Sequence, residues 1–438
     1  MKKKIISLLL AMTMTCTMLA GCGSTASAPT EKTETTESAD AKESADSLET
    51  TGDTIKIGIS GPTTGDSAES GVNVNTGIQM AIDEFNEAGG VTIDGVKKKI
   101  EAVYYDTGSD AQTGLSNCEK LITSDKVDFL WCESFNSAVG VATMELAKKY
   151  DIPMATLEPV SSAITEKVAS DPEGFSNFFK FGWDSDAYGD TCANTILTLV
   201  ESGKLDLPNK TIALCGDETD YGRSNLAAVA AIMKDNGYTV VSENYWEFGA
   251  TDLYSIISDV KSSNADVIFS CSTTAATGVA FIKQLKENGL GSVPHMAIYY
   301  PLLPEFVSQI GSQADGLLCA PKLIDIENNQ SDAEFAEKVK DYCGDEMTFD
   351  HLDGYSDMKV VLEAMDAAGS VAADKLGEKL LSEDGYDVPK GHIKMNPDTH
   401  TIYYGAGYVP INAAQIQDDV SYIIYPEENA VSTFQTIE

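Results

Sequence analysis

The stretch KVDFLWCESFNSAVG at residues 126–140 reads as a buried strand followed by a polar loop and the start of a helix. A second stretch, NADVIFSCSTTAATG at residues 264–278, aligns with it without a gap. Both carry Asp at the third position, three large apolar residues after it, Ser at the ninth position and Gly at the end. A chance similarity is the alternative, because strand–helix units in general share this pattern of apolar and polar residues. The similarity otherwise indicates two lobes of like construction, each presenting a strand end rich in Ser, Thr and Asn.

Strand-like runs separated by helical segments recur outward from these two stretches. A chain of 438 residues is long enough for two packed lobes. Strands that alternate with helices form parallel sheets covered by helices on both faces. We therefore expect an α/β fold of two doubly wound lobes. The runs lie at residues 55–60, 100–105, 127–131, 153–157, 178–181, 211–215, 239–245, 267–271 and 296–299.

Two terminal regions differ from this alternation. The first 22 residues, MKKKIISLLLAMTMTCTMLAGC, have a basic start, a short apolar stretch and small residues before Cys22. This pattern resembles the bacterial lipoprotein signal, which predicts a signal peptide at 1–21 and lipidation of Cys22; an ordinary secretory signal with a chance cysteine is the alternative. Residues 22–53, poor in large apolar side chains, predict a disordered tether. Near the other end, residues 391–411 read as paired strands around a turn at 396–398.

Composition narrows the function classes. The chain has 68 acidic and 30 basic residues, a formal charge of −38, so we expect no nucleic-acid partner. Four histidines and no nucleophile elbow give no indication of an enzyme, and the spacing of the residues predicts neither a metal site nor a cofactor. The seven cysteines after Cys22 occur singly, which favours buried free thiols, with a Cys118–Cys132 bridge as the alternative.

The glycine-rich stretch IGISGPTTGDSAESG at residues 57–71 does not fit a nucleotide site. It lacks the Gly-Lys-Ser/Thr ending of a Walker loop and the spacing of a dinucleotide fingerprint. Its hydroxyls and backbone N–H groups suit a small carboxylate or amide, and its glycines would let the backbone approach such a guest. A plain strand–helix turn without a ligand is the alternative.

Several longer stretches together carry a family resemblance. IKIGISGPTTGDSAESGVNVNTGIQMAIDEFNEAGGV and YYDTGSDAQTGLSNCEKLITSDKVDFL resemble the first lobe of the solute-binding proteins of branched-chain amino acid ABC transporters. DETDYGRS, GATDLYSIISDVKSSNADVIF and FIKQLKENGL resemble the second lobe, and GYSDMKVVLEAMDAAGS resembles a late helix. The resemblance implies a type I periplasmic binding protein fold with three crossover segments. The expected lobes are 54–178 with 294–388, and 179–293 with 389–438.

The resemblance also implies ligand contacts. Ser134, Asn136 and Ser137 lie where the family grips a ligand carboxylate, with helix capping as the alternative. Tyr221 lies where the family places an aromatic ring against the ligand, and a core position is its alternative. The facing strand ends in three hydroxyl residues: Ser272, Thr273 and Thr274.

One departure from the family pattern concerns the ligand's amino group. Tyr299 and Tyr300 stand where branched-chain members place an acidic residue. Glu158 can compensate, since a carboxylate there would favour a positive or donor-rich nitrogen; a solvated edge residue or a helix-capping charge is the alternative. Trp183, after the first crossover, is expected to pack the hinge, with a position lining the mouth of the cleft as the alternative.

These features predict a monomeric, lipid-anchored, extracytoplasmic binding protein. It would capture a small amino acid, of the branched-chain type or similar, and deliver it to an ABC permease and its ATPase subunits. Urea or short-amide uptake, or ligand sensing through a separate receptor, are the alternatives.

Overall fold

The computed structural model describes residues 54–65, 67–322 and 324–436. The predicted signal peptide, the lipidation site Cys22 and the tether of residues 22–53 lie outside the described residues. Within the described ranges, no helix combines the length and the apolar character needed to cross a bilayer.

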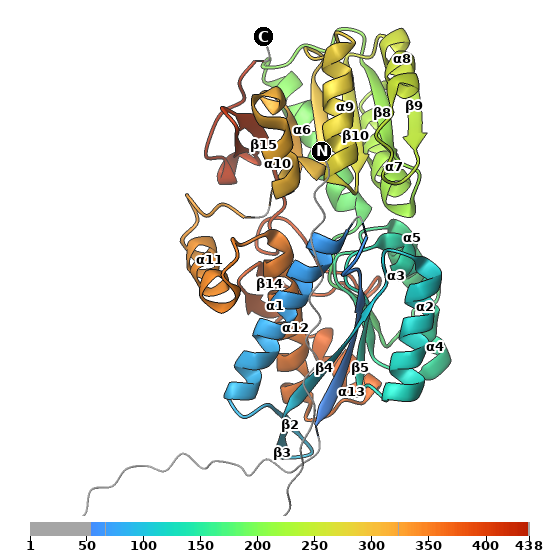
Figure 1. The fold of residues 1–438 in the computed structure, drawn as a ribbon, viewed down its shortest axis with the longest axis vertical. Helices are drawn as coiled ribbons and strands as arrows, with labels where there is room; N and C mark the ends of the chain where they lie inside the picture. The colour runs from blue at the N-terminus through green and yellow to red at the C-terminus, as the bar shows by residue number, and fades with distance from the viewer. Residues whose placement is uncertain (1–53, 66, 323, 437–438) are drawn as a thin grey trace, which may run out of the picture. The chain divides into compact units, whose positions relative to one another are not determined.

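A five-stranded parallel sheet, in the order β4-β1-β5-β6-β7, forms the centre of the first lobe (Figure 1). Alternate residues of β5 point to opposite faces of this sheet. Phe129 and Trp131 join the core that contains residues of α1 and α12, whereas Leu130 and Cys132 join the core that contains residues of α2 and α5. The strands are β1 Ile55–Gly61, β4 Ile100–Asp106, β5 Phe129–Glu133, β6 Met154–Thr156 and β7 Phe178–Lys180. The helices are α1 Ala68–Glu87, α2 Ala111–Lys120, α3 Ser137–Thr143, α4 Glu145–Tyr150, α5 Ser162–Ser170, α11 Gln330–Cys343, α12 Phe349–Ala368 and α13 Ala373–Leu380.

A seven-stranded sheet, in the order β16-β15-β12-β11-β10-β8-β9, forms the centre of the second lobe. Its last five strands are parallel, whereas β15 and β16 are antiparallel additions. The strands are β8 Thr211–Asp217, β9 Thr239–Trp246, β10 Val267–Ser272, β11 His295–Tyr299, β12 Leu318–Lys322, β15 Asn412–Gln417 and β16 Val420–Tyr425. The helices are α6 Ser185–Glu201, α7 Asp220–Asp235, α8 Tyr254–Ser263, α9 Ala275–Glu287 and α10 Pro304–Ile310. Two short ribbons complete the described strands: β2 Val91–Ile93 with β3 Val96–Lys98, and β13 Tyr386–Val388 with β14 Gly391–Ile393.

The two sheets share one strand order, as the internal sequence similarity predicts. In chain order, β1 and β4 to β7 of the first sheet correspond to β8 to β12 of the second. The similar stretches 126–140 and 264–278 contain β5 and β10, which occupy corresponding positions. Every predicted run overlaps an observed strand, and the α/β prediction is confirmed.

The expected boundary at residue 294 needs one correction. It assigned β11 and β12 to the first lobe, but β11 pairs with β10, and β12 pairs with β11. Each is reached by a helix that crosses back from the preceding strand, so both extend the second sheet. Helices α11 and α12, further along the chain, contact α1 of the first lobe.

The predicted strand pair at 391–411 forms only in part. Met395 and Ile402 make an antiparallel bridge across the expected turn. Thr401 also bridges Lys180 in parallel, so this segment attaches to the edge strand β7 of the first sheet.

Helices α1 and α12 pack unusually closely through glycine. A Cβ atom added at Gly77 would lie 2.2 Å from the carbonyl oxygen of His351, and one added at Gly354 would lie 2.2 Å from that of Val74. Only the absence of side chains at both glycines allows this backbone contact.

Candidate ligand-binding site

A pocket that is partly open to solvent lies where the parallel strands of both sheets end. This is the position at which open α/β sheets bind ligands. Its lining comes from both lobes: Phe135, Asn136, Ser137, Ala138, Glu158, Val160, Phe181, Gly182, Trp183, Tyr188, Thr219, Tyr221, Thr273, Tyr299, Phe349, Asp353, Lys390 and Ile402.

The loop after β5 is held in place by its own polar groups. Glu133 Oε1 accepts hydrogen bonds from the backbone N–H groups of Phe135 (3.0 Å) and Asn136 (2.9 Å). Asn136 Oδ1 caps α3 by accepting from the N–H of Ala138 at 3.1 Å. Ser137 Oγ accepts from the N–H of Val160 at 3.1 Å, which ties this loop to the one after β6. The pocket wall on this side is therefore preorganised.

On the second lobe, Asp217 at the end of β8 has the corresponding role. Its carboxylate accepts from Trp246 Nε1 at 2.7 Å and from Thr273 Oγ1 at 2.7 Å. These bonds fix the loop after β10 against the end of β8. Thr219 caps α7 by accepting from the N–H of Gly222 at 3.1 Å.

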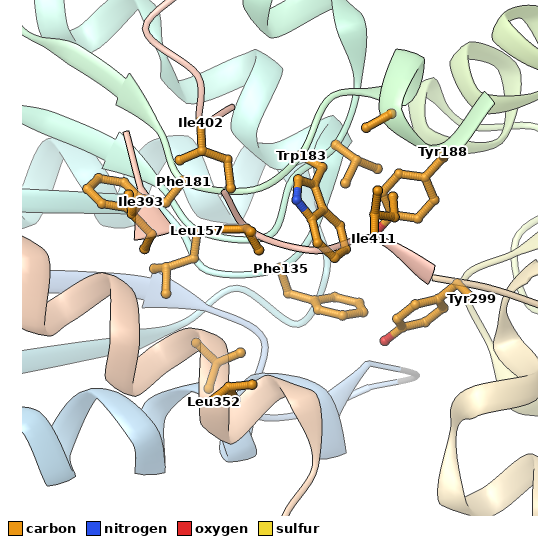
Figure 2. Packing of buried hydrophobic residues seen from close by; sticks show 14 of the residues in the cluster. Phe135, Leu157, Phe181, Trp183, Tyr188, Tyr299, Leu352, Ile393, Ile402 and Ile411 are labelled. Carbon is orange, nitrogen blue, oxygen red and sulfur yellow. The ribbon is translucent and has the colours of Figure 1, made fainter. Parts of the chain in front are cut away.

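Tyr299 links the aromatic side chains of the pocket (Figure 2). Its ring centroid lies 6.0 Å from that of Phe135, 6.4 Å from that of Tyr221 and 5.6 Å from that of Phe349. Its backbone has φ 74° and ψ −64°, a conformation that non-glycine residues rarely adopt. Strain of this kind clusters at functional sites, and here it accompanies the placement of the ring in the pocket.

The aromatic residues that line the pocket include two buried polar atoms without a hydrogen-bond partner. Trp183 and Tyr188 meet edge to face with centroids 5.9 Å apart, and Figure 2 shows Trp183 next to Tyr188 and near Phe135. Trp183 Nε1 and Tyr221 Oη are both buried, and neither has a hydrogen-bond partner in the structure. Such groups are rare in folded proteins, and a bound acceptor would satisfy them.

The polar end of the pocket is dominated by carboxylates. Glu158 and Asp353 line it together with Lys390, whose Nζ lies 3.4 Å from Asp353 Oδ1 and 2.6 Å from Asp357 Oδ1. Burial, followed by the charges of Asp350 and Asp353, raises the pKa of Glu158 well above its ordinary value. Burial also raises the pKa of Asp357 to about 8, although Lys390 opposes this shift.

The structure places the sequence-predicted site residues in two groups. Asn136, Ser137, Glu158, Tyr221, Thr273 and Tyr299 line the pocket. Ser272 Oγ bonds Asp217 and the carbonyl oxygen of Thr274, and Thr274 caps α9 by accepting from the N–H of Thr277. Ser134 is buried and is not part of the lining. Tyr300 lies in the core of the second lobe, where its Oη is 2.8 Å from Ser270 Oγ. Ligand contact by any predicted residue stays a prediction.

Trp183 is buried among core residues and also lines the pocket, so both interpretations of this residue agree with its position. The glycine-rich stretch differs from what its sequence suggested. The described part of 57–71 contributes nothing to the lining, and its glycines serve packing: a Cβ at Gly61 would lie 1.8 Å from Ser134 Oγ, and one at Gly71 would lie 1.7 Å from the carbonyl oxygen of Pro62.

Sequence reasoning missed the charged residues that α12 and the last crossover contribute. Asp353 comes from inside α12, and Lys390 directly precedes β14. A signal was present, because Asp350, Asp353 and Asp357 are spaced three and four residues apart and share one helix face. All three are buried, so that face is not a solvated one.

The cysteines and candidate metal ligands lie apart from the pocket lining. All seven described cysteines are free, so the Cys118–Cys132 bridge is wrong; Cys118 Sγ instead donates to the carbonyl oxygen of Cys132 at 3.2 Å. Among the described residues, one group has the geometry to hold a metal ion, Cys343 with Asp345 and His351. The sequence spacing did not predict this group, and none of its members lines the pocket.

Two lobes of like topology, with a pocket between the carboxyl ends of their strands, define the type I periplasmic binding protein fold. A family model described as periplasmic binding protein matches residues 54–415, and the chain therefore belongs to that family. Members of this family are extracytoplasmic solute-binding proteins, and the relatives that the chain matches are solute-binding proteins and not enzymes. Binding proteins of this family take up small ligands and work with ABC transporter permeases.

Individual relatives are similar over most of the chain. The leucine-, isoleucine-, valine-, threonine- and alanine-binding protein of Pseudomonas aeruginosa is 24% identical over 344 residues, which cover 78% of this chain and 85% of the relative. A Leu/Ile/Val-binding protein homologue of Brucella suis is 24% identical over 399 residues, covering 86% and 93%.

Two solved structures show the same fold with different ligands. The branched-chain amino acid binding protein of Streptococcus pneumoniae, in complex with isoleucine, has a TM-score of 0.68 at 20% identity and covers 85% of this chain and 100% of its own. A solute-binding protein of R. palustris, in complex with benzoate, has a TM-score of 0.71 at 17% identity and covers 88% and 99%. The fold therefore does not determine the ligand.

Proposed function

We propose that this protein captures a small solute of the amino-acid kind for an ABC importer, attached to the outer face of the membrane through the lipid on Cys22. The observation that carries the proposal is the polarity of the pocket. Glu158 presents a buried oxygen, Oε1, that has no hydrogen-bond partner, and Trp183 Nε1 and Tyr221 Oη are donors without one. An amino group and an acceptor oxygen on one small molecule would satisfy all three atoms.

The mechanism follows from the origin of these groups. Glu158 and Trp183 follow strands of the first lobe, whereas Tyr221 and Tyr299 belong to the second lobe. A solute held by both sets would bridge the lobes and stabilise their closed arrangement, as in other hinged binding proteins. Desolvated hydrogen bonds and ring contacts would supply the affinity.

The acid-rich lining disfavours an anionic ligand such as benzoate. A ligand carboxylate near Glu158 and Asp353 would bring a further negative charge into an acidic site of low dielectric, which is unfavourable. Lys390 cannot compensate freely, because its ammonium already lies 2.6 Å from Asp357 Oδ1.

The test is a thermal-shift screen of the full-length chain, in detergent, against the amino acids, urea and short amides, followed by calorimetry of each hit. We expect an amino acid or closely related amine to give the largest stabilisation. Urea or an amide as the best ligand would replace the amino-acid assignment with the alternative. A soluble receptor domain pulled down by the loaded protein, without a permease, would favour sensing over uptake.

A further inference from the structure

The carboxylates around the pocket outnumber the cations. Asp350, Asp353 and Asp357 lie on one face of α12, and the charges of all three raise the pKa of Glu158, so the four groups are electrostatic neighbours. Lys390 is the one cationic side chain in the described lining. Burying several carboxylates beside a single ammonium is unfavourable unless they take up protons or a further positive charge enters.

The polar side chains assigned to a ligand carboxylate carry no positive charge. Asn136 Oδ1 and Ser137 Oγ accept hydrogen bonds within the chain, which leaves the amide and hydroxyl hydrogens of these residues as neutral donors. Thr273 Oγ1 donates to Asp217. Trp183 Nε1 and Tyr221 Oη are further donors, and both are neutral. The pocket can therefore satisfy an acceptor oxygen but provides no free positive charge to neutralise a carboxylate.

A metal ion does not explain the surplus of carboxylates. Among the described residues, the one group with metal-binding geometry is Cys343, Asp345 and His351, which excludes all four of these acids. The rest of the lining is aromatic, including Trp183, Tyr188, Tyr221 and Tyr299. Carboxylates combined with aromatic rings bind organic ammonium groups, through charge and through cation–π attraction.

We infer that the pocket selects a solute of net positive charge, an organic amine on a compact apolar body, in preference to the zwitterionic and anionic forms of the same body. This rests on the proposed function and narrows its ligand class. The ammonium lies against Glu158 and Asp353, while the apolar part contacts the rings of Trp183, Tyr188 and Tyr299.

A matched series of ligands tests the charge requirement without any mutation. Isoamylamine, L-leucine and 4-methylpentanoate share one branched body and carry charges of about +1, 0 and −1 at neutral pH. Phenethylamine, L-phenylalanine and 3-phenylpropionate form an aromatic series of the same kind. Calorimetry on the full-length chain should show each amine binding about tenfold or more tightly than its amino acid, with no measurable binding of the carboxylates.

One variant gives an independent readout of the charge requirement. Asp353→Asn should weaken amine binding about tenfold. Glu166→Gln, an exposed carboxylate outside the lining, is the matched control and should have no effect.

The outcomes separate this inference from the proposed function. Tighter binding of leucine or phenylalanine than of the amines would overturn the charge requirement and leave the amino-acid function standing. Tight binding of a carboxylate would overturn both. If none of the six compounds binds, and a cooperative melting transition shows that the protein is folded, this inference is overturned and the result counts against the proposed ligand class.

Discussion

The hydroxyl of Tyr299, at the end of β11 in the second sheet, lies 3.1 Å from the hydroxyl of Ser70 in α1 of the first lobe. Both residues are buried. This hydrogen bond joins the two lobes beside the pocket, and it does so through the residue whose ring contacts Phe135, Tyr221 and Phe349.

Tyr299→Phe removes this bond and keeps the ring. A hydrogen bond of this kind contributes about 1 kcal/mol net, so we expect the affinity for the best ligand to fall about fivefold. Small-angle scattering of the ligand-free variant should show a larger radius of gyration, because the closed arrangement has lost a contact. An unchanged affinity and an unchanged radius would mean that the bond does not contribute to closure.

Glu158→Gln tests the amino-group site. The substitution preserves the shape of the side chain but removes the charge, so an amino acid or amine should bind more than about tenfold more weakly by calorimetry. Glu166→Gln on α5 serves as the control, because its side chain is exposed and outside the pocket. Equal affinities of the two variants would remove Glu158 from the site.

Tyr221→Ala distinguishes a ligand contact from a core position. Tyr221 lines the pocket and is only partly buried, so its loss should abolish or strongly weaken binding while the melting temperature changes by a few degrees at most. The contrasting variant is Tyr300→Ala, since Tyr300 is fully buried against Phe306. That variant should lower the melting temperature strongly. A comparable loss of stability in Tyr221→Ala would mark Tyr221 as a core residue.

Glu133→Gln should make stability less dependent on pH. Burial raises the pKa of Glu133 to about 8 from an ordinary value of 4.5, so the folded state holds this proton more tightly than the unfolded chain does. Its contribution to stability is therefore fully present below pH 4.5 and is lost as the pH rises through about 8. Gln cannot ionise, and its carbonyl can still accept from the N–H groups of Phe135 and Asn136.

Urea unfolding at pH 5, 7 and 8.5 measures this effect. The free energy of unfolding of Glu133→Gln, relative to the unmodified chain, should rise with pH by an amount on the order of a few kcal/mol and level off above pH 8. A constant difference across the three pH values would show that Glu133 does not titrate in this range.

The sequence predicted the strands well because buried parallel strands are short, uninterrupted apolar runs, a local property. The family resemblance led to Glu158 and Tyr299, and their position fits the general rule that pockets in such sheets form at strand ends. These two residues lie at the ends of β6 and β11, which correspond in the two sheets. The direction of the Tyr299 ring was not predictable, because it depends on an unusual backbone conformation.

The roles of Asp353 and Lys390 in the pocket could not be predicted from local sequence patterns, for a different physical reason. One lies inside a helix and the other just before a short ribbon, 37 residues later in the chain, and only tertiary packing brings their charged groups to 3.4 Å. The second lobe's boundary was misplaced for a similar reason, since β12 is recognised as its strand only through its pairing with β11.

The contact of α1 with α12 through Gly77 and Gly354 has a mechanical consequence. Two helices in direct backbone contact cannot move independently. The carboxylates on α12 and Ser70 on α1 must therefore move together as one rigid unit whenever the lobes rearrange. Adjustment of the pocket to ligands of different shape is then confined to the second lobe, which carries Tyr221 and Tyr299. To change the ligand specificity, individual carboxylates on α12 should be replaced. A larger residue at Gly77 or Gly354 would instead force α1 and α12 apart and disrupt this side of the pocket.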